Sequence, residues 1–181
     1  MNSKSIFVAL AALALASSAT AQDMSRFKDG PVVTGFGKTV PIESDLPIPR
    51  KAVFKVLLDG STGAKPGEPN RTLDSAARFL NMHVAAGVPL RNVRIVVVIH
   101  GQASIDLTSD AFYGQRRDGA TNANGDLVRQ LVAHGVEVYL CGQSAAAFGI
   151  TKADLIPGVK VSLSAMTARA LYEQQGYVLV Q

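Results

Sequence analysis

The sequence has a single cysteine, Cys141, no tryptophan and only 6% aromatic residues. One cysteine cannot form an internal disulfide, which excludes the disulfide framework of many small secreted proteins. The fold must therefore depend on its hydrophobic core, and a hydrophobic fraction of 48% is typical of a compact globular protein. With only three histidines beside this cysteine, no close ligand spacing exists, and we expect no metal site.

Excess charge and nucleotide-binding motifs are also lacking. The net charge is only +4 and the basic residues form no stripe, so we expect no nucleic acid partner. The segment G-F-G-K-T (residues 35–39) lacks the first glycine of a phosphate-binding loop, because Val32 stands at that position. No G-x-G-x-x-G motif follows the first predicted strand and no G-x-S-x-G motif occurs, so the sequence indicates neither a bound cofactor nor a serine hydrolase.

No apolar run is long enough to span a bilayer. Residues 6–16 are apolar, but a transmembrane helix needs roughly 20 such residues. Lys4 precedes this run and A-T-A (residues 19–21) follows it, which is the pattern of a signal peptide with its cleavage site. We therefore expect residues 1–21 to be a signal peptide, and the protein to be periplasmic without membrane contact once this peptide is removed.

Residues 22–50 are rich in glycine and proline, which predicts an extended N-terminal arm. Strand and helix patterns alternate over residues 51–181. The predicted strands are residues 52–58, 94–99, 136–140, 159–163 and 177–180, and the predicted helices are residues 70–86, 124–134, 144–148 and 164–175. A polar loop is expected before residue 124, with residues 113–117 as a solvated excursion, a lid or a subunit contact. This alternation predicts an α/β domain with an open, doubly wound parallel sheet in three layers, of the flavodoxin or Rossmann kind.

Three predicted strands are followed by the dipeptides D-G, H-G and C-G, at Asp59, His100 and Cys141. Ligands of such sheets bind beyond the carboxyl ends of the strands, so these residues are expected along one edge of the molecule. His100 is a candidate proton shuttle or pocket wall, and a histidine hydrogen-bonded within its turn is the alternative. Asp59 is expected only to cap the following turn.

Cys141 lies between a predicted strand and a predicted helix, where Gly142 permits a tight turn. Unpaired amides at a helix start stabilise a thiolate, and Gln143 and Ser144 add polar groups at the same place. The pattern predicts a nucleophilic or sulfur-carrying cysteine with Gly142, Gln143 and Ser144 as its anion-binding turn. A buried, space-filling cysteine is the alternative, because free cysteine is among the most buried residue types.

Four segments resemble the DsrE/DsrF-like family of sulfur-relay proteins. They are V-V-V-I-H-G (residues 96–101), L-V-A-H-G-V-E-V-Y-L-C-G-Q-S (131–144), D-L-I-P-G-V-K-V-S-L-S-A (154–165) and E-Q-Q-G-Y (173–177). The resemblance covers residues 51–181, and its most specific part is the C-G-Q-S turn. It implies a compact α/β fold assembled as homotrimers or homohexamers.

The resemblance also implies a role for Cys141, which matches the position of the family's sulfur-carrying cysteine. In that role Cys141 holds sulfane sulfur as a persulfide and passes it from a donor to an acceptor, as a sulfurtransferase or sulfur carrier. A noncatalytic oligomeric module that binds a small ligand with the same fold is the alternative function.

Overall fold

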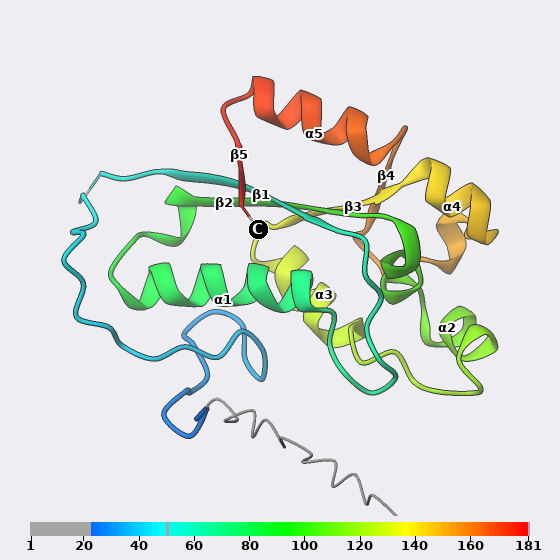
Figure 1. The fold of residues 1–181 in the computed structure, drawn as a ribbon, viewed down its shortest axis with the longest axis horizontal. Helices are drawn as coiled ribbons and strands as arrows, with labels where there is room; N and C mark the ends of the chain where they lie inside the picture. Colours follow the sequence, from blue (N-terminus) through cyan, green and yellow to red (C-terminus); the bar gives the residue numbers. More distant parts are fainter. Residues whose placement is uncertain (1–22, 50, 181) are drawn as a thin grey trace, which may run out of the picture.

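The computed structural model describes residues 23–49 and 51–180 (Figure 1), so the predicted signal peptide lies outside the described residues. Five parallel strands form one sheet in the order β4-β3-β2-β1-β5. The strands are β1 (Phe54–Gly60), β2 (Val93–Ile99), β3 (Glu137–Cys141), β4 (Lys160–Ser162) and β5 (Val178–Val180). None of the helices within the described residues has the length and hydropathy of a membrane span.

Helices cover both faces of the sheet. The α-helices are α1 (Arg71–Ala85), α2 (Asp110–Arg116), α3 (Gly125–Ala133), α4 (Gly142–Phe148) and α5 (Ala165–Gln174), and the 3-10 helices are η1 (Leu90–Asn92), η2 (Gly101–Leu107) and η3 (Lys152–Asp154). Helices α1 and α3 lie on one face and α5 lies on the other (Figure 1). The chain runs from β1 through β2 and β3 to β4, and then crosses back over the sheet to β5. Because connections between parallel strands are right-handed, this reversal of direction places α5 on the face opposite to α1 and α3. The prediction of an open, doubly wound parallel sheet is confirmed.

The sheet separates two hydrophobic clusters. The larger cluster lies between the sheet and helices α1 and α3, and it includes Val97 and Ile99 of β2. The smaller cluster, on the α5 face, consists of Leu57, Val96, Val98, Cys141, Ala165 and Ala168. Successive residues of β2 thus serve opposite clusters, which explains why this strand is an unbroken apolar run. Cys141 belongs to the cluster that a single helix covers.

The arm packs along α1 on the side away from the sheet (Figure 1). Asn81 of α1 is fully buried and makes five hydrogen bonds to the backbone of the arm. Its Oδ1 accepts from the amides of Val32 and Val33 at 3.0 and 2.9 Å, and its Nδ2 donates to the carbonyl oxygen of Val33 at 2.9 Å. One buried amide therefore anchors a segment that has almost no regular structure of its own.

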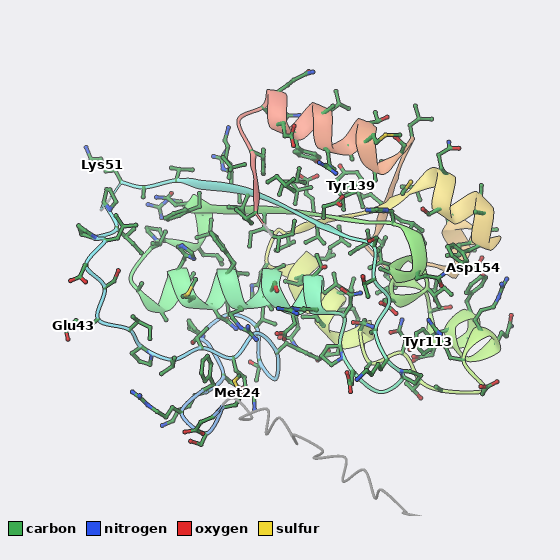
Figure 2. All side chains as sticks on the ribbon, viewed as in Figure 1. Met24, Glu43, Lys51, Tyr113, Tyr139 and Asp154 are labelled. Atoms are coloured by element: carbon green, nitrogen blue, oxygen red, sulfur yellow. The ribbon has the colours of Figure 1, made fainter. Side chains whose placement is uncertain are left out.

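The prediction of a polar loop before residue 124 is wrong. Helices η2 and α2 occupy much of this segment, and Tyr113 of α2 is fully buried (Figure 2). Helix α2 begins after Ser109, whose Oγ accepts from the amide of Phe112 at 3.4 Å. It has only seven residues, too few for an apolar repeat to stand out in the sequence.

Candidate functional site

The strand order brings the ends of β1, β2 and β3 together at one edge of the sheet. Strand β1 continues to Gly60, which pairs with Ile99, so Asp59 lies inside the strand and not in the following turn. Ile99 pairs with Leu140 on the other side, which places His100 and Cys141 at the same level of neighbouring strands. Neighbouring strands are about 5 Å apart, so His100 and Cys141 lie side by side, and Asp59 lies two residues before their level because it pairs with Val98.

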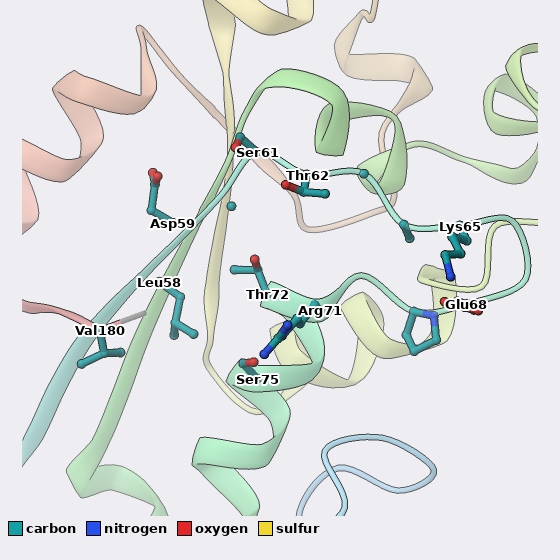
Figure 3. A pocket seen from close by; sticks show the side chains of 14 residues that line it. Leu58, Asp59, Ser61, Thr62, Lys65, Glu68, Arg71, Thr72, Ser75 and Val180 are labelled. Carbon is teal, nitrogen blue, oxygen red and sulfur yellow. The ribbon is translucent and has the colours of Figure 1, made fainter. Parts of the chain in front are cut away.

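Side chains alternate between the two faces along each strand, and those of Asp59, His100 and Cys141 point to the face covered by α5. Val98 and Cys141 both belong to the α5-side cluster, and His100 follows Val98 by two residues with extended backbone angles. Asp59 and Leu58 point to opposite sides of β1 (Figure 3). The side chains of Asp59, His100 and Cys141 therefore share the face that α5 covers.

Cys141 is the last residue of β3 and the N-cap of α4, and it is only 6% exposed. Burial raises the pKa of the Cys141 thiol, but hydrogen bonds from the Ser144 amide and hydroxyl and from the Ala165 and Gln143 amides outweigh this effect. The resulting pKa of Cys141 lies below the ordinary value for cysteine. The sulfur is thus buried among apolar neighbours on one side and faces N–H and O–H donors of two helices on the other.

Ser144 links the sulfur to the turn after β2. Its hydroxyl oxygen accepts from the amide of Gly101 at 3.1 Å. The same hydroxyl helps to lower the pKa of Cys141. Because its oxygen accepts from Gly101, its proton is left to be donated elsewhere.

Gly142 and Gln143 act through their backbones. A Cβ atom at Gly142 would lie 2.6 Å from the carbonyl oxygen of Ser162 and 3.2 Å from that of Leu163, so only glycine allows this close approach to β4. The Gln143 side chain donates from Nε2 to the carbonyl oxygen of Leu163 at 3.3 Å. Its backbone N–H is the group that helps to lower the pKa of Cys141. The sequence predicted a turn at these residues, but it did not indicate whether their side chains or their backbone N–H groups face the sulfur.

His100 is hydrogen-bonded to a carboxylate. Its Nε2 lies 3.1 Å from Oδ2 of Asp59, with the two side chains 32% and 18% exposed. Arg169 of α5 has NH1 3.7 Å from the same Oδ2, beyond hydrogen-bonding distance but close enough for attraction between charges. The other carboxylate oxygen of Asp59 is buried and has no hydrogen-bond partner among the described residues.

Sequence reasoning underrated Asp59 and missed Ala165 and Arg169. The D-G dipeptide was a signal for Asp59, since it matches the H-G and C-G dipeptides in position. No local signal exists for the Ala165 amide or for Arg169, because the crossover from β4 to β5 brings α5 over the edge. Within the described residues, no group of three His, Cys, Asp or Glu side chains is arranged to hold a metal ion.

A cavity of about 530 Å³ opens beside the end of β1, and Asp59 is among the residues that line it (Figure 3). It lies between the ends of β1 and β5 and the start of α1, where Val180, Arg71 and Thr72 contribute to its wall. The glycine-containing loop after β1, with Lys65, closes another side. Neither His100 nor Cys141 is among the described residues that line this cavity.

Comparison with known proteins agrees with this geometry. The sequence model of the DsrE/DsrF-like family matches residues 51–181. The chain belongs to the DsrE/DsrF-like family. Its fold is similar to that of a protein of unknown function, MTH1491 from Methanobacterium thermoautotrophicum, with 20% identity and a TM-score of 0.53 over 70% of this chain and 97% of that one. The YchN protein from E. coli matches with 21% identity and a TM-score of 0.43 over the same shares of the two chains. No curated protein matches the sequence.

Proposed function

We propose that this DsrE/DsrF-like protein carries sulfane sulfur as a persulfide on Cys141 and passes it to an acceptor. The observation that supports this most directly is the set of donors around the sulfur, which lower the pKa of Cys141 despite its burial. A thiolate is the nucleophilic form of cysteine, and the same donors stabilise the anionic persulfide that replaces it. The small exposed fraction of Cys141 favours donors with a slender terminal sulfur.

The transfer is balanced without an external oxidant. The Cys141 thiolate attacks the terminal sulfur of a donor persulfide, R–S–SH, and a new S–S bond forms at Sγ. The S–S bond of the donor breaks, and its electron pair leaves with the thiolate R–S⁻. Attack by an acceptor thiolate on the terminal sulfur of the Cys141 persulfide reverses these roles and releases the Cys141 thiolate.

We further propose that the mature chain is periplasmic and assembles as a homotrimer or homohexamer. The leader pattern of residues 1–21 supports export. Assembly is supported by apolar side chains at the α5 side of the molecule: Leu163, Met166 and Leu171 are 73%, 77% and 53% exposed. Cell fractionation tests the location, and native mass spectrometry tests the number of copies.

The deciding experiment is mass analysis of protein recovered from the periplasm without reductant, followed by incubation with glutathione persulfide. We expect Cys141 to gain the mass of one sulfur atom and to lose it again to an added thiol acceptor. Cys141→Ser is the control and should gain nothing. If Cys141 gains no sulfur and is alkylated only after unfolding, the proposed function is wrong.

A second candidate function is noncatalytic binding of a small polar ligand. It is favoured by the cavity beside β1, whose volume falls within the range of roughly 300–1,000 Å³ usual for ligand pockets. This function predicts that Cys141→Ser leaves both ligand binding and the biological role intact. Native mass spectrometry of the recovered protein distinguishes a bound small molecule from a sulfur adduct.

A further inference from the structure

The hydrogen bond between Asp59 and His100 defines how the imidazole is presented at the edge of the sheet. A carboxylate oxygen only accepts, so the bond of 3.1 Å requires Nε2 of His100 to carry its proton. The second ring nitrogen, Nδ1, has no hydrogen-bond partner among the described residues, and 32% of the side chain is exposed. His100 therefore has one nitrogen held by Asp59 and another free to exchange a proton.

This free nitrogen lies on the same face and at the same strand level as Cys141. The paired positions Ile99 and Leu140 immediately precede His100 and Cys141, so the two side chains are neighbours across adjacent strands. Asp59 of β1 contacts the imidazole, and Arg169 of α5 contacts the same Asp59 oxygen. Cys141 of β3 is the titratable group at the level of His100 on the neighbouring strand. One imidazole thus lies between the Asp59 carboxylate, which it contacts, and the strand position of the Cys141 thiol.

We propose that Asp59 and His100 form a proton relay for sulfur transfer at Cys141, with His100 as general acid and base and Asp59 as its positioning residue. The proposal rests on the function proposed above. Asp59 holds the ring and keeps Nε2 protonated, so that Nδ1 is the nitrogen that accepts or releases the proton. Arg169 has NH1 3.7 Å from the same Asp59 oxygen and places a positive charge beside the carboxylate.

The protons balance over one transfer. Nδ1 accepts the proton of the Cys141 thiol, and the thiolate then attacks the terminal sulfur of the donor R–S–SH. The bond between the two donor sulfurs breaks as the new bond to Sγ forms. The leaving thiolate R–S⁻ takes the proton from Nδ1 and departs as R–SH, so the imidazole ends neutral, as it began.

The test compares two reagents that differ in how much their leaving group needs a proton. Glutathione persulfide releases a basic thiolate, whereas an aromatic disulfide releases a weakly basic one that leaves unaided. In the full chain, His100→Gln keeps a donor for Asp59 but cannot transfer a proton. We expect this variant to slow sulfur uptake from glutathione persulfide by about 10²-fold and to slow the aromatic disulfide reaction by a much smaller factor, because only removal of the Cys141 proton is lost there.

Two further variants separate the relay from a structural role. Asp59→Asn should slow glutathione persulfide uptake by a smaller factor, again with a weaker effect on the aromatic disulfide. Added imidazole should restore uptake to His100→Ala, which a lost packing contact would not allow. His134→Gln, an exposed change at the C-cap of α3, is the matched control and should react like the unaltered chain.

Each other outcome has a definite meaning. Equal loss with both reagents shows that the variants disturb the sulfur itself, and it overturns the relay, as does full uptake by His100→Gln. In both cases the proposed function stands if the unaltered chain gains sulfur. If the unaltered chain gains no sulfur from glutathione persulfide, the proposed function and the relay fall together.

Discussion

At the scale of single residues, the reactivity of Cys141 is decided by which groups face its sulfur. Burial alone would disfavour the thiolate, as it does for cysteines that only fill space. Here the Ser144 amide and hydroxyl and the Ala165 and Gln143 amides reverse that effect on the pKa. Cys141 is buried, as one of the two sequence alternatives expects, and the anion-binding turn stays a prediction that these donors support.

Replacing Ser144 with alanine removes one of these donors and leaves the backbone amide in place. Without the hydroxyl the thiolate is less stable, because it loses a hydrogen bond to its charge, so the pKa of Cys141 should rise. Alkylation by iodoacetamide, followed as a function of pH, should show its midpoint shifted upward and a slower rate near neutral pH. Ser75→Ala, on α1, is the control, and an unmoved midpoint in Ser144→Ala would contradict the assigned role.

At the scale of elements, the turn from β3 into α4 depends on a close approach to β4. His100 and Cys141 are side by side because parallel pairing aligns the ends of β2 and β3, and Asp59 lies two residues before them on β1. Gly142 is what allows the chain to turn there without colliding with the Ser162 carbonyl. The position of the donors around the sulfur thus follows from backbone packing between β3, α4 and β4.

Replacing Gly142 with alanine places a Cβ atom 2.6 Å from the Ser162 oxygen, a contact with backbone that cannot rotate away. We expect the unfolding free energy to fall by about 1–3 kcal/mol, as in other overpacked sites, and the alkylation of Cys141 to change as α4 shifts. Urea denaturation measures the first effect. Gly125→Ala is the matched control, because its Cβ would meet only the flexible end of Arg129 and should be tolerated.

At the scale of the whole molecule, the arm is held by α1 and not by structure of its own. The Asn81 side chain of α1 makes hydrogen bonds to backbone groups of the arm. Because this side chain is buried, water cannot take its place as hydrogen-bond partner. The arm adds Val33, which is fully buried, to the larger hydrophobic cluster. Arm and sheet domain are therefore expected to be stable together.

Asn81→Ala removes the five hydrogen bonds and leaves amides of Val32 and Val33 without their acceptor. We expect a loss of stability of about 1–3 kcal/mol and faster proteolysis within residues 23–49 than in the unaltered chain. Limited proteolysis with mass analysis of the fragments locates the cleavage. Arg71→Ala, an exposed change at the start of the same helix, should leave the arm protected; equal protection in Asn81→Ala would show that the arm is held elsewhere.

The sequence by itself determined the alternation of strands and helices, the parallel sheet, the family and the candidate residue Cys141. These features depend on local patterns, since the strand and helix periods and the glycines after each strand are set by neighbours along the chain. Short elements escaped this reasoning, as α2 did, because seven residues carry too little pattern.

Only the tertiary structure decided the strand order, the contact between Asp59 and His100, and the donors that reach Cys141 from α5. These contacts join residues far apart in the sequence, such as Cys141 and Ala165, and no local pattern encodes them. These contacts form because the second face of the sheet is covered by α5, in the crossover from β4 to β5. This crossover passes over the edge where β1, β2 and β3 end. The same hydrophobic burial that stabilises the fold thus sets the electrostatic surroundings of the sulfur.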